Sequence, residues 1–322
     1  MLKLCRFSKH PLWLFSIVFM TACDSGHKVT HATLDKRASP EQLSAMNQTT
    51  KAANDYYFGF DLRSSPQEDA RQYLPFLEYL KKSTGYNFKL RFTPKDGKIV
   101  DDLGRGVVQF AAIGATSYVQ AAIQYKVIPL VRGVNSQGKA EYRSMMIVRK
   151  NSPIHNLRDI RGKRFAFGSV TSTQGHLIPR IILSQQGIKL SDFSRYEYTG
   201  SHQKCADAVI SGRFDVCGLQ DTMAKNLANK QPVRILHASA YFPSSGIAAN
   251  KDVAREVVDK VRQALLNFRP KGRDAKGLYH WDKTEMANGF VAATDNDYSA
   301  LRKWLYKLGF IDSTQDLPKG DL

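Results

Sequence analysis

Acidic residues, cysteines and long apolar runs are scarce in this sequence of 322 residues. Asp and Glu number 29 against 47 Lys and Arg, which gives a formal net charge of +18, and there are 4 cysteines. No apolar run of about 18 residues occurs after residue 30, which excludes a polytopic membrane protein. Hydrophobic residues still make up 43% of the chain, enough for one large or two medium domains, so a largely disordered protein is also excluded.

The N-terminus has the layout of a secretory signal. Three basic residues precede the apolar stretch 12–20, which is too short to span a bilayer stably. The residues at 20–23, Met-Thr-Ala-Cys, resemble a bacterial lipobox, in which the cysteine is lipidated and becomes the mature N-terminus. The alternative is an uncleaved anchor in which Cys23 is incidental. We therefore expect a signal peptide at 1–22 and a lipid on Cys23, with Asp24 resembling the signal for retention in the inner membrane.

This location decides how the positive charge is interpreted. Clustered Lys and Arg can bind a nucleic-acid phosphate backbone, but a lipoprotein of the periplasm does not meet chromosomal DNA. We expect instead that the charge attracts small anions and holds the tethered protein near an anionic membrane surface. The remaining cysteine pair, Cys205 and Cys217, can form a disulfide in an oxidising compartment or remain as two buried thiols, and the sequence leaves both open.

The body of the chain alternates short strand-like runs with amphipathic helices, which predicts an α/β fold with mainly parallel sheets. Residues 23–54 are polar and aperiodic, as in a flexible tether. Two extended segments, near 145–153 and 244–249, look like crossings between lobes. We therefore expect one lobe from 55–142 plus 245–322, and an inserted second lobe at 143–244 that is rich in Lys and Arg.

The most informative segment is 165–179, Phe-Ala-Phe-Gly-Ser-Val-Thr-Ser-Thr-Gln-Gly-His-Leu-Ile-Pro. A buried strand ends at Gly168, a Gly/Ser/Thr loop follows, and a helix starts near Gly175. A helix start offers unpaired N–H groups and the positive end of the helix dipole, to which Ser172 and Thr173 add hydroxyl donors. This pattern predicts an anion site without a formal charge, although plain N-capping by Ser and Thr explains it equally well.

Several segments in order resemble the phosphate, phosphite and phosphonate-binding proteins of ABC importers, a branch of the type II periplasmic binding proteins. Ser-Thr-Gln-Gly-His-Leu-Ile-Pro at 172–179 is similar to the family's Ser-Thr-Ser-Gly segment, and Gly-Ser-His at 200–202 to its Gly-x-His segment. Phe-Gly-Phe at 58–60 and the helix with Thr84-Gly85 resemble its first strand, helix and turn. The resemblance covers most of 56–310 and implies two α/β lobes joined by two crossing strands.

The resemblance also implies which residues contact a ligand. Ser172, Thr173, Gln174 and Gly175 would present hydroxyls, an amide and backbone N–H groups to an oxyanion, and His202 and Tyr142 would complete the site. For His202 a capping or surface role is the alternative, and for Tyr142 a core role. Further residues expected at the cleft are Asp96, Thr116, Gln220, Asp221, Thr222 and Ser245.

Some of these positions depart from the family pattern. Gln174 replaces a second Ser, and Asp96 stands where many members have a Tyr. Aminophosphonate-binding members present carboxylates to the ligand's ammonium, whereas the corresponding positions here are Thr222 and Ser245. An ammonium without a counter-charge is costly in a closed cleft, so we expect a small oxyanion or alkylphosphonate.

The resemblance implies an extracytoplasmic solute-binding lipoprotein that serves an ABC permease of the inner membrane. The alternative is a sensory module of the same fold that reports ligand occupancy to a membrane kinase. An enzyme is not expected, because Ser172, His202 and Asp215 lack a Gly-x-Ser-x-Gly elbow and no His-Glu-x-x-His metal motif occurs. We expect a monomer with no cofactor, no metal and no nucleic-acid partner.

Overall fold

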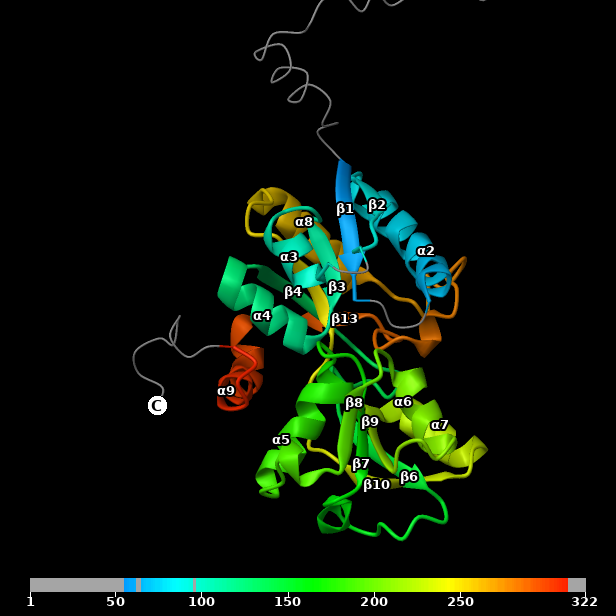
Figure 1. Cartoon of the computed structure of the whole chain (residues 1–322). Coiled ribbons are helices and arrows are strands. Elements are labelled where there is room, and N and C mark those ends of the chain that lie inside the picture. The colour runs from blue at the N-terminus through cyan, green and yellow to red at the C-terminus, as the bar shows by residue number, and fades with distance from the viewer. Residues whose placement is uncertain (1–54, 62–64, 95–96, 312–322) are drawn as a thin grey trace, which may run out of the picture. The chain divides into compact units, whose positions relative to one another are not determined.

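The computed structural model describes residues 55–61, 65–94 and 97–311. Their helices and strands form two lobes, each built on its own sheet (Figure 1). The expected signal and tether at 1–54, with Cys23, and also Asp96 lie outside the described residues. Within the described part of the chain, no helix is both long and apolar enough to cross a membrane.

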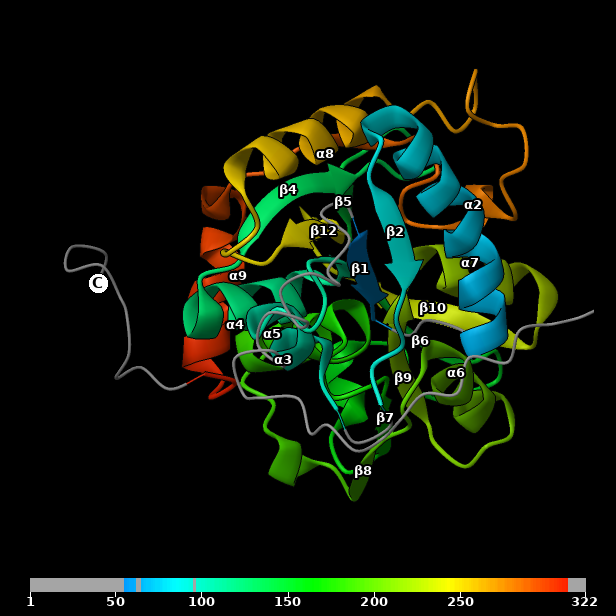
Figure 2. The same cartoon turned by 90° about the horizontal axis from the view of Figure 1, so that it is seen from above.

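The first lobe contains a six-stranded sheet in the order β13-β4-β12-β3-β1-β2. The helices α2 and α8 cover one of its faces, and α3, α4 and α9 cover the other (Figure 2). The strands are β1 Asp55–Phe60, β2 Asn87–Leu90, β3 Phe110–Ile113, β4 Ile128–Gly133, β12 Gly246–Ala249 and β13 Phe290–Ala292. The helices are α2 Pro66–Thr84, α3 Ile99–Gly104, α4 Ala115–Tyr125, α8 Arg255–Asn267 and α9 Ser299–Lys307.

The second lobe contains a five-stranded sheet in the order β10-β6-β9-β7-β8. Helix α5 packs on one face, and α6 and α7 pack on the other. The strands are β6 Ser144–Arg149, β7 Arg164–Phe167, β8 Arg195–Tyr198, β9 Val216–Gln220 and β10 Val233–Ala238. The helices are α5 Ile178–Gln185, preceded by a π-helical turn at Thr173–Leu177, α6 His202–Ile210 and α7 Asp221–Lys230.

The chain crosses between the lobes twice, and the two crossings lie side by side. β5 (Glu141–Tyr142) and β11 (Phe242–Pro243) form a small antiparallel ribbon. The strand that follows each crossing starts beside the carboxyl end of a neighbour, with Ser144 opposite Gln220 and Gly246 opposite Ile113. β6 and β12 therefore run against their neighbours, while β7, β8 and β9 in one sheet and β1, β2 and β3 in the other are parallel. The expected two-lobed α/β architecture is confirmed.

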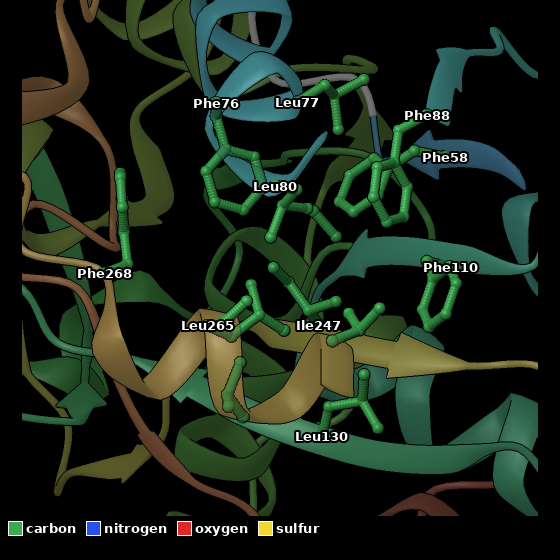
Figure 3. Packing of buried hydrophobic residues seen from close by; sticks show 14 of the residues in the cluster. Phe58, Phe76, Leu77, Leu80, Phe88, Phe110, Leu130, Ile247, Leu265 and Phe268 are labelled. Carbon is green, nitrogen blue, oxygen red and sulfur yellow. The ribbon is translucent and has the colours of Figure 1, made fainter. Parts of the chain in front are cut away.

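The core of the first lobe follows from strand alternation. Successive side chains of a strand point to opposite faces, so Phe110 and Ala112 of β3 face α2 and α8, whereas Ala111 and Ile113 face α3 and α4. Phe76, Leu77 and Leu80 of α2 lie across the core from Leu265 and Phe268 at the end of α8 (Figure 3). This packing fixes the carboxyl ends of β1 and β3 relative to the helices around them.

A disulfide joins α6 to the central strand of the second sheet. It links Cys205 to Cys217, which are 12 residues apart with their Cα atoms 5.8 Å apart. Both side chains are fully buried in the cluster beneath α6 and α7. The bond therefore fixes the helix that begins at His202 against β9.

Candidate functional site

A cleft of about 870 Å³ lies where the carboxyl ends of strands from both lobes meet. Its lining includes Asp61 and Gly114, which directly follow β1 and β3, Ser169, two residues after β7, and Gln220 at the end of β9. The carboxyl edge of a parallel sheet is the usual place for a ligand in α/β proteins. The topology thus directs loops of both lobes into one cavity.

The loop between β7 and the π-helical turn approaches the strand unusually closely. The Gly168 N–H donates to the Gly175 carbonyl at 2.8 Å, and the Ser172 hydroxyl accepts the Gly175 N–H at 2.9 Å. A Cβ added at Gly175 would lie 2.9 Å from Ser172 Oγ, 3.0 Å from His202 Cε1 and 3.1 Å from Gly168 Cα. A side chain there would force these neighbours to shift, and the small size of glycine lets His202 lie against the loop.

Ser172, Thr173, Gln174 and His202 all line the cleft. Ser172 caps the π-helical turn, and His202 is the first residue of α6, which Ser201 caps by accepting the Lys204 N–H at 3.1 Å. The first N–H groups of a helix have no intrahelical partner and carry the positive end of its dipole. Two helix starts therefore meet in the second lobe, and together they favour an anion.

Two of these side chains also make structural hydrogen bonds. The Thr173 hydroxyl accepts the Thr116 N–H of the first lobe at 2.9 Å. The Gln174 amide donates to the Arg143 carbonyl beside the crossing ribbon at 3.1 Å, and the residue is only 3% exposed. Gln174 thus anchors the loop to the crossing segment, so its amide nitrogen is engaged away from an anion.

Tyr142 and Ser245 bring the crossings themselves into the cleft. Both residues line it and are almost fully buried. Gln220 also lines the cleft, and its amide donates to Glu285 Oε1 of the first lobe at 3.3 Å. Together with the bond between Thr116 and Thr173, this contact joins the lobes across the cleft.

The remaining predicted residues lie away from the lining. Gly175 and Thr116 are buried behind it, and Thr222 is exposed on α7. Asp221 is buried at the start of α7, where its carboxylate accepts the Thr222 N–H at 2.9 Å and burial raises its pKa. The structure has a capped helix start at this loop, as the sequence pattern predicts, but the pattern did not distinguish residues that line the cleft from residues buried behind it.

The first lobe contributes carboxylates that the sequence analysis missed. Asp61, Glu68 and Glu285 line the cleft, as do Gln72 and Lys283. Asp61 follows β1 and accepts the Gly114 N–H at 2.8 Å and the Ser117 hydroxyl at 3.0 Å. The position of Asp61 directly after a buried strand was a signal that could have identified it. Glu285 lies in an irregular segment, where the sequence offers no such signal. The cleft therefore contains carboxylates that can pair with an ammonium, and the prediction from Thr222 and Ser245 that it lacks them is wrong.

His176 lies directly beside the loop at 168–175 but inside the protein. It is 3% exposed, its Nδ1 lies 2.7 Å from the Val170 carbonyl oxygen, and its ring packs against Phe310. Burial lowers its pKa to about 4. The ring is therefore neutral near pH 7 and holds the loop in place through the bond to Val170.

The geometry does not support a hydrolase triad. Asp215 lies at the amino end of β9, at the opposite edge of the sheet from Ser172, and both of its oxygens accept hydrogen bonds from Arg164. Across 55–61, 65–94 and 97–311, no cluster of three or more His, Cys, Asp or Glu side chains could hold a metal ion.

Comparison with known proteins gives a consistent assignment. Residues 58–298 match the family model of the phosphonate periplasmic substrate-binding protein of ABC transporters. The chain is 28% identical over 221 residues to the phosphonates-binding periplasmic protein of Escherichia coli, a match that covers 66% of this chain and 65% of that protein. It is also 28% identical over 251 residues to a phosphate-import protein of Mycolicibacterium smegmatis, covering 71% of this chain and 78% of that one.

A solved structure agrees in fold. A protein of Prochlorococcus marinus in complex with methylphosphonate superposes with a TM-score of 0.70 at 22% identity, covering 80% of this chain and 99% of that one. The two lobes therefore have the type II periplasmic binding protein fold. Because the family model spans most of the chain, this protein belongs to the phosphonate-binding family of periplasmic substrate-binding proteins of ABC transporters.

Proposed function

We propose that this protein captures a small phosphorus oxyanion, such as phosphite, phosphate or an alkylphosphonate, in the periplasm and delivers it to an ABC permease. The observation that carries the proposal is the meeting of two helix starts, at Ser172 and at His202, inside a cleft closed by the first lobe. Neutral dipoles aimed at a buried anion bind it strongly because water is excluded. This arrangement requires no bond-breaking residue.

Each proposed site residue has a distinct role. The Ser172 hydroxyl accepts the Gly175 N–H, so its own proton is available for the anion. Thr173 would bridge ligand and first lobe, because its oxygen already accepts the Thr116 N–H. His202 would donate as a neutral ring, since a helix start disfavours a second positive charge. Gln174 and Gly175 position the loop, and Tyr142 closes the cleft at the crossing.

Capture would proceed by hinge closure about the ribbon of β5 and β11. In support, both chain crossings lie in that ribbon, and two hydrogen bonds already join the lobes across the cleft. We include in this proposal the lobe bounds, 55–142 plus 245–322 for the first lobe and 143–244 for the second. We also include a signal peptide at 1–22, a tether at 23–54 and a lipid on Cys23 that anchors the protein in the inner membrane. These last three features are supported by the sequence alone.

A thermal-shift and calorimetry panel tests the proposal. Phosphite, phosphate and methylphosphonate are compared with 2-aminoethylphosphonate, because the carboxylates of the first lobe can pair with the ammonium group of such a ligand. A ligand at 100 times its Kd adds about 2.7 kcal/mol to the free energy of unfolding. We expect at least one of the oxyanions to raise the Tm, and Ser172→Ala or His202→Ala to abolish that rise.

The matched control is Thr222→Ala, on an exposed residue outside the cleft lining. It should retain the full ligand-induced shift. If no phosphorus oxyanion raises the Tm, or if His202→Ala binds as tightly as the natural protein, the proposed site is wrong. Tightest binding of 2-aminoethylphosphonate would keep the site but overturn the preference for a small oxyanion or alkylphosphonate that carries no amine.

A further inference from the structure

The excess positive charge of the second lobe collects at the end of its sheet that faces away from the cleft. β6 ends there at Arg149, opposite Val233 at the start of β10, and β7 and β8 begin there with Arg164 paired to Arg195. The segment that follows β6 runs along this end, on the side away from the first sheet (Figure 1). We call this surface the basic edge; it comprises Arg149, Lys150, Arg158, Arg161, Lys163, Arg164, Lys189, Arg195, Arg213, Lys230 and Arg234.

Backbone contacts place the turns of the basic edge next to one another. The Lys150 N–H donates to the Pro232 carbonyl at 2.8 Å, directly after α7 ends at Lys230. The Ser194 N–H donates to the Lys163 carbonyl at 3.1 Å, and the Asp215 N–H donates to the Arg164 carbonyl at 3.0 Å. The cationic turns therefore form one continuous surface rather than separate patches.

The acidic residues at this edge are already engaged. Asp215 pairs with Arg164 at 2.7 Å and with Arg149 at 3.8 Å, Asp192 pairs with Arg161, and Glu197 pairs with Arg195 at 2.9 Å. Asp159 accepts the backbone N–H groups of His155 and Asn156. Within the described ranges, the other cations of the edge have no acidic partner within 4.0 Å. Of these, Lys150, Arg158, Lys189, Arg213 and Lys230 are exposed.

This charge is too far away to serve the ligand. β7 separates the basic edge from Ser169 at the cleft, and its four residues span about 13 Å at 3.3 Å per residue. The Debye length is about 8 Å at physiological salt, so exposed charges at that distance are largely screened. The expectation that the charge excess concentrates anions at the site is therefore not supported by where the charge lies.

The position of the basic edge also argues against the permease as its partner. A ligand leaves through the cleft, so the surface that meets the permease must surround the cleft, at the carboxyl ends of the strands. The basic edge lies at the opposite ends. It extends across five strands about 4.8 Å apart, which is wide enough to meet several anionic groups at once.

We propose that the basic edge binds the anionic headgroups of a lipid membrane. In the periplasm, a membrane is an extended anionic surface that the protein meets constantly, and each Lys or Arg near such a surface adds to the attraction. β1 begins at the end of the first sheet away from the cleft, opposite the basic edge, so the basic edge can touch the membrane only if residues 23–54 reach past both lobes (Figure 1). Such contact would hold the cleft close to the bilayer, where a permease is located.

Vesicle binding tests this proposal. The mature chain carrying Cys23→Ser, which removes any lipid, is sedimented with vesicles of phosphatidylcholine alone and with vesicles containing phosphatidylglycerol. We expect binding only to the anionic vesicles, with an affinity that falls as salt rises. The triple variant Lys150→Glu/Arg158→Glu/Lys230→Glu should lose at least tenfold in affinity.

The control variant Lys82→Glu/Lys260→Glu/Lys276→Glu changes the net charge equally, on exposed positions of the first lobe. It should bind vesicles nearly as well as the unaltered chain. Equal losses in the two variants would show that only net charge matters and would overturn the proposal, as would tighter binding to an anionic polysaccharide than to vesicles. The thermal shift with phosphite should be the same in both variants. A result that overturns membrane binding can therefore be distinguished from one that overturns the proposed ligand site.

Discussion

At the scale of single residues, the site depends on a glycine at one position of the loop. Gly175 has no Cβ, and so its backbone can lie against Gly168 while His202 closes over it. A larger residue would push apart the two helix starts that are expected to share the anion. The sequence showed the glycine as part of a loop, and its contacts show that a larger residue would force its neighbours to move.

We predict that Gly175→Ala destabilises the protein by about 1–3 kcal/mol and weakens ligand binding, because the new methyl group overlaps Ser172, His202 and Gly168. Urea unfolding and calorimetry measure the two effects. Gly272→Ala is the control, since a Cβ there meets nothing closer than 3.7 Å. Full retention of binding by Gly175→Ala would contradict the close packing of the loop.

His176 makes stability depend on pH. Its folded-state pKa is about 4 against an ordinary value of 6.5, so the unfolded chain binds the proton more tightly. Its contribution is complete above pH 6.5 and is lost as the pH falls toward 4, by up to about 3 kcal/mol. We predict that His176→Asn flattens the fall in unfolding free energy over this range. A steep slope that persists in His176→Asn would exclude this cause.

At the scale of elements, α6 is held to β9 by a covalent bond as well as by packing. The disulfide of Cys205 and Cys217 closes a short loop and lies in the same buried cluster as Val209 and Leu219. Because α6 begins with His202, any loosening of this helix moves a proposed ligand contact.

We predict that Cys205→Ala/Cys217→Ala lowers the free energy of unfolding by about 3 kcal/mol, the loss expected when a loop of this length is opened. Chemical denaturation measures the change. A reducing agent should destabilise the natural protein by a similar amount and have no effect on the double variant. If reduction leaves the unmodified chain as stable as before, the bond contributes nothing to stability.

At the scale of the whole molecule, the lobes share more than a hinge. Leu177 and Ile181 of the second lobe lie in the same apolar cluster as Leu301 and Leu305 of α9. The Thr116 N–H adds a polar contact by donating to the Thr173 hydroxyl, and Gln220 adds another to Glu285. Contact between the lobes is therefore built partly from residues that also line the ligand cleft.

We predict that Thr173→Val favours separation of the lobes in the ligand-free protein, because it leaves the buried Thr116 N–H without its acceptor, at a cost of about 1–3 kcal/mol. Small-angle scattering should report a larger radius of gyration for this variant. Thr173→Ser keeps the oxygen and should resemble the natural protein. An unchanged radius in Thr173→Val would mean that this bond does not hold the lobes together.

Local pattern was sufficient to predict the alternation of strands and helices, but not every element. The buried strand expected to end at Gly168 ends at Phe167 in the structure, because a short apolar run followed by turn residues leaves little choice. β4 and α7 are not indicated by local pattern, since β4 contains Pro129 and Arg132 and α7 is rich in polar residues. The loop at 172–175 was identified because capping residues and glycine have local causes.

The sequence by itself determined the two-lobed α/β fold and the capped helix start at 172–175, since periodicity and helix starts depend on neighbouring residues. Tertiary structure alone decided which side chains face the cleft. Gln174 is engaged by Arg143, Thr173 reaches Thr116, and Asp61 and Glu285 enter from the other lobe. It also decided that most cations of the second lobe lie at the edge opposite the cleft. A strand carries the chain across the sheet, so the residues just before a strand and those just after it lie at opposite ends.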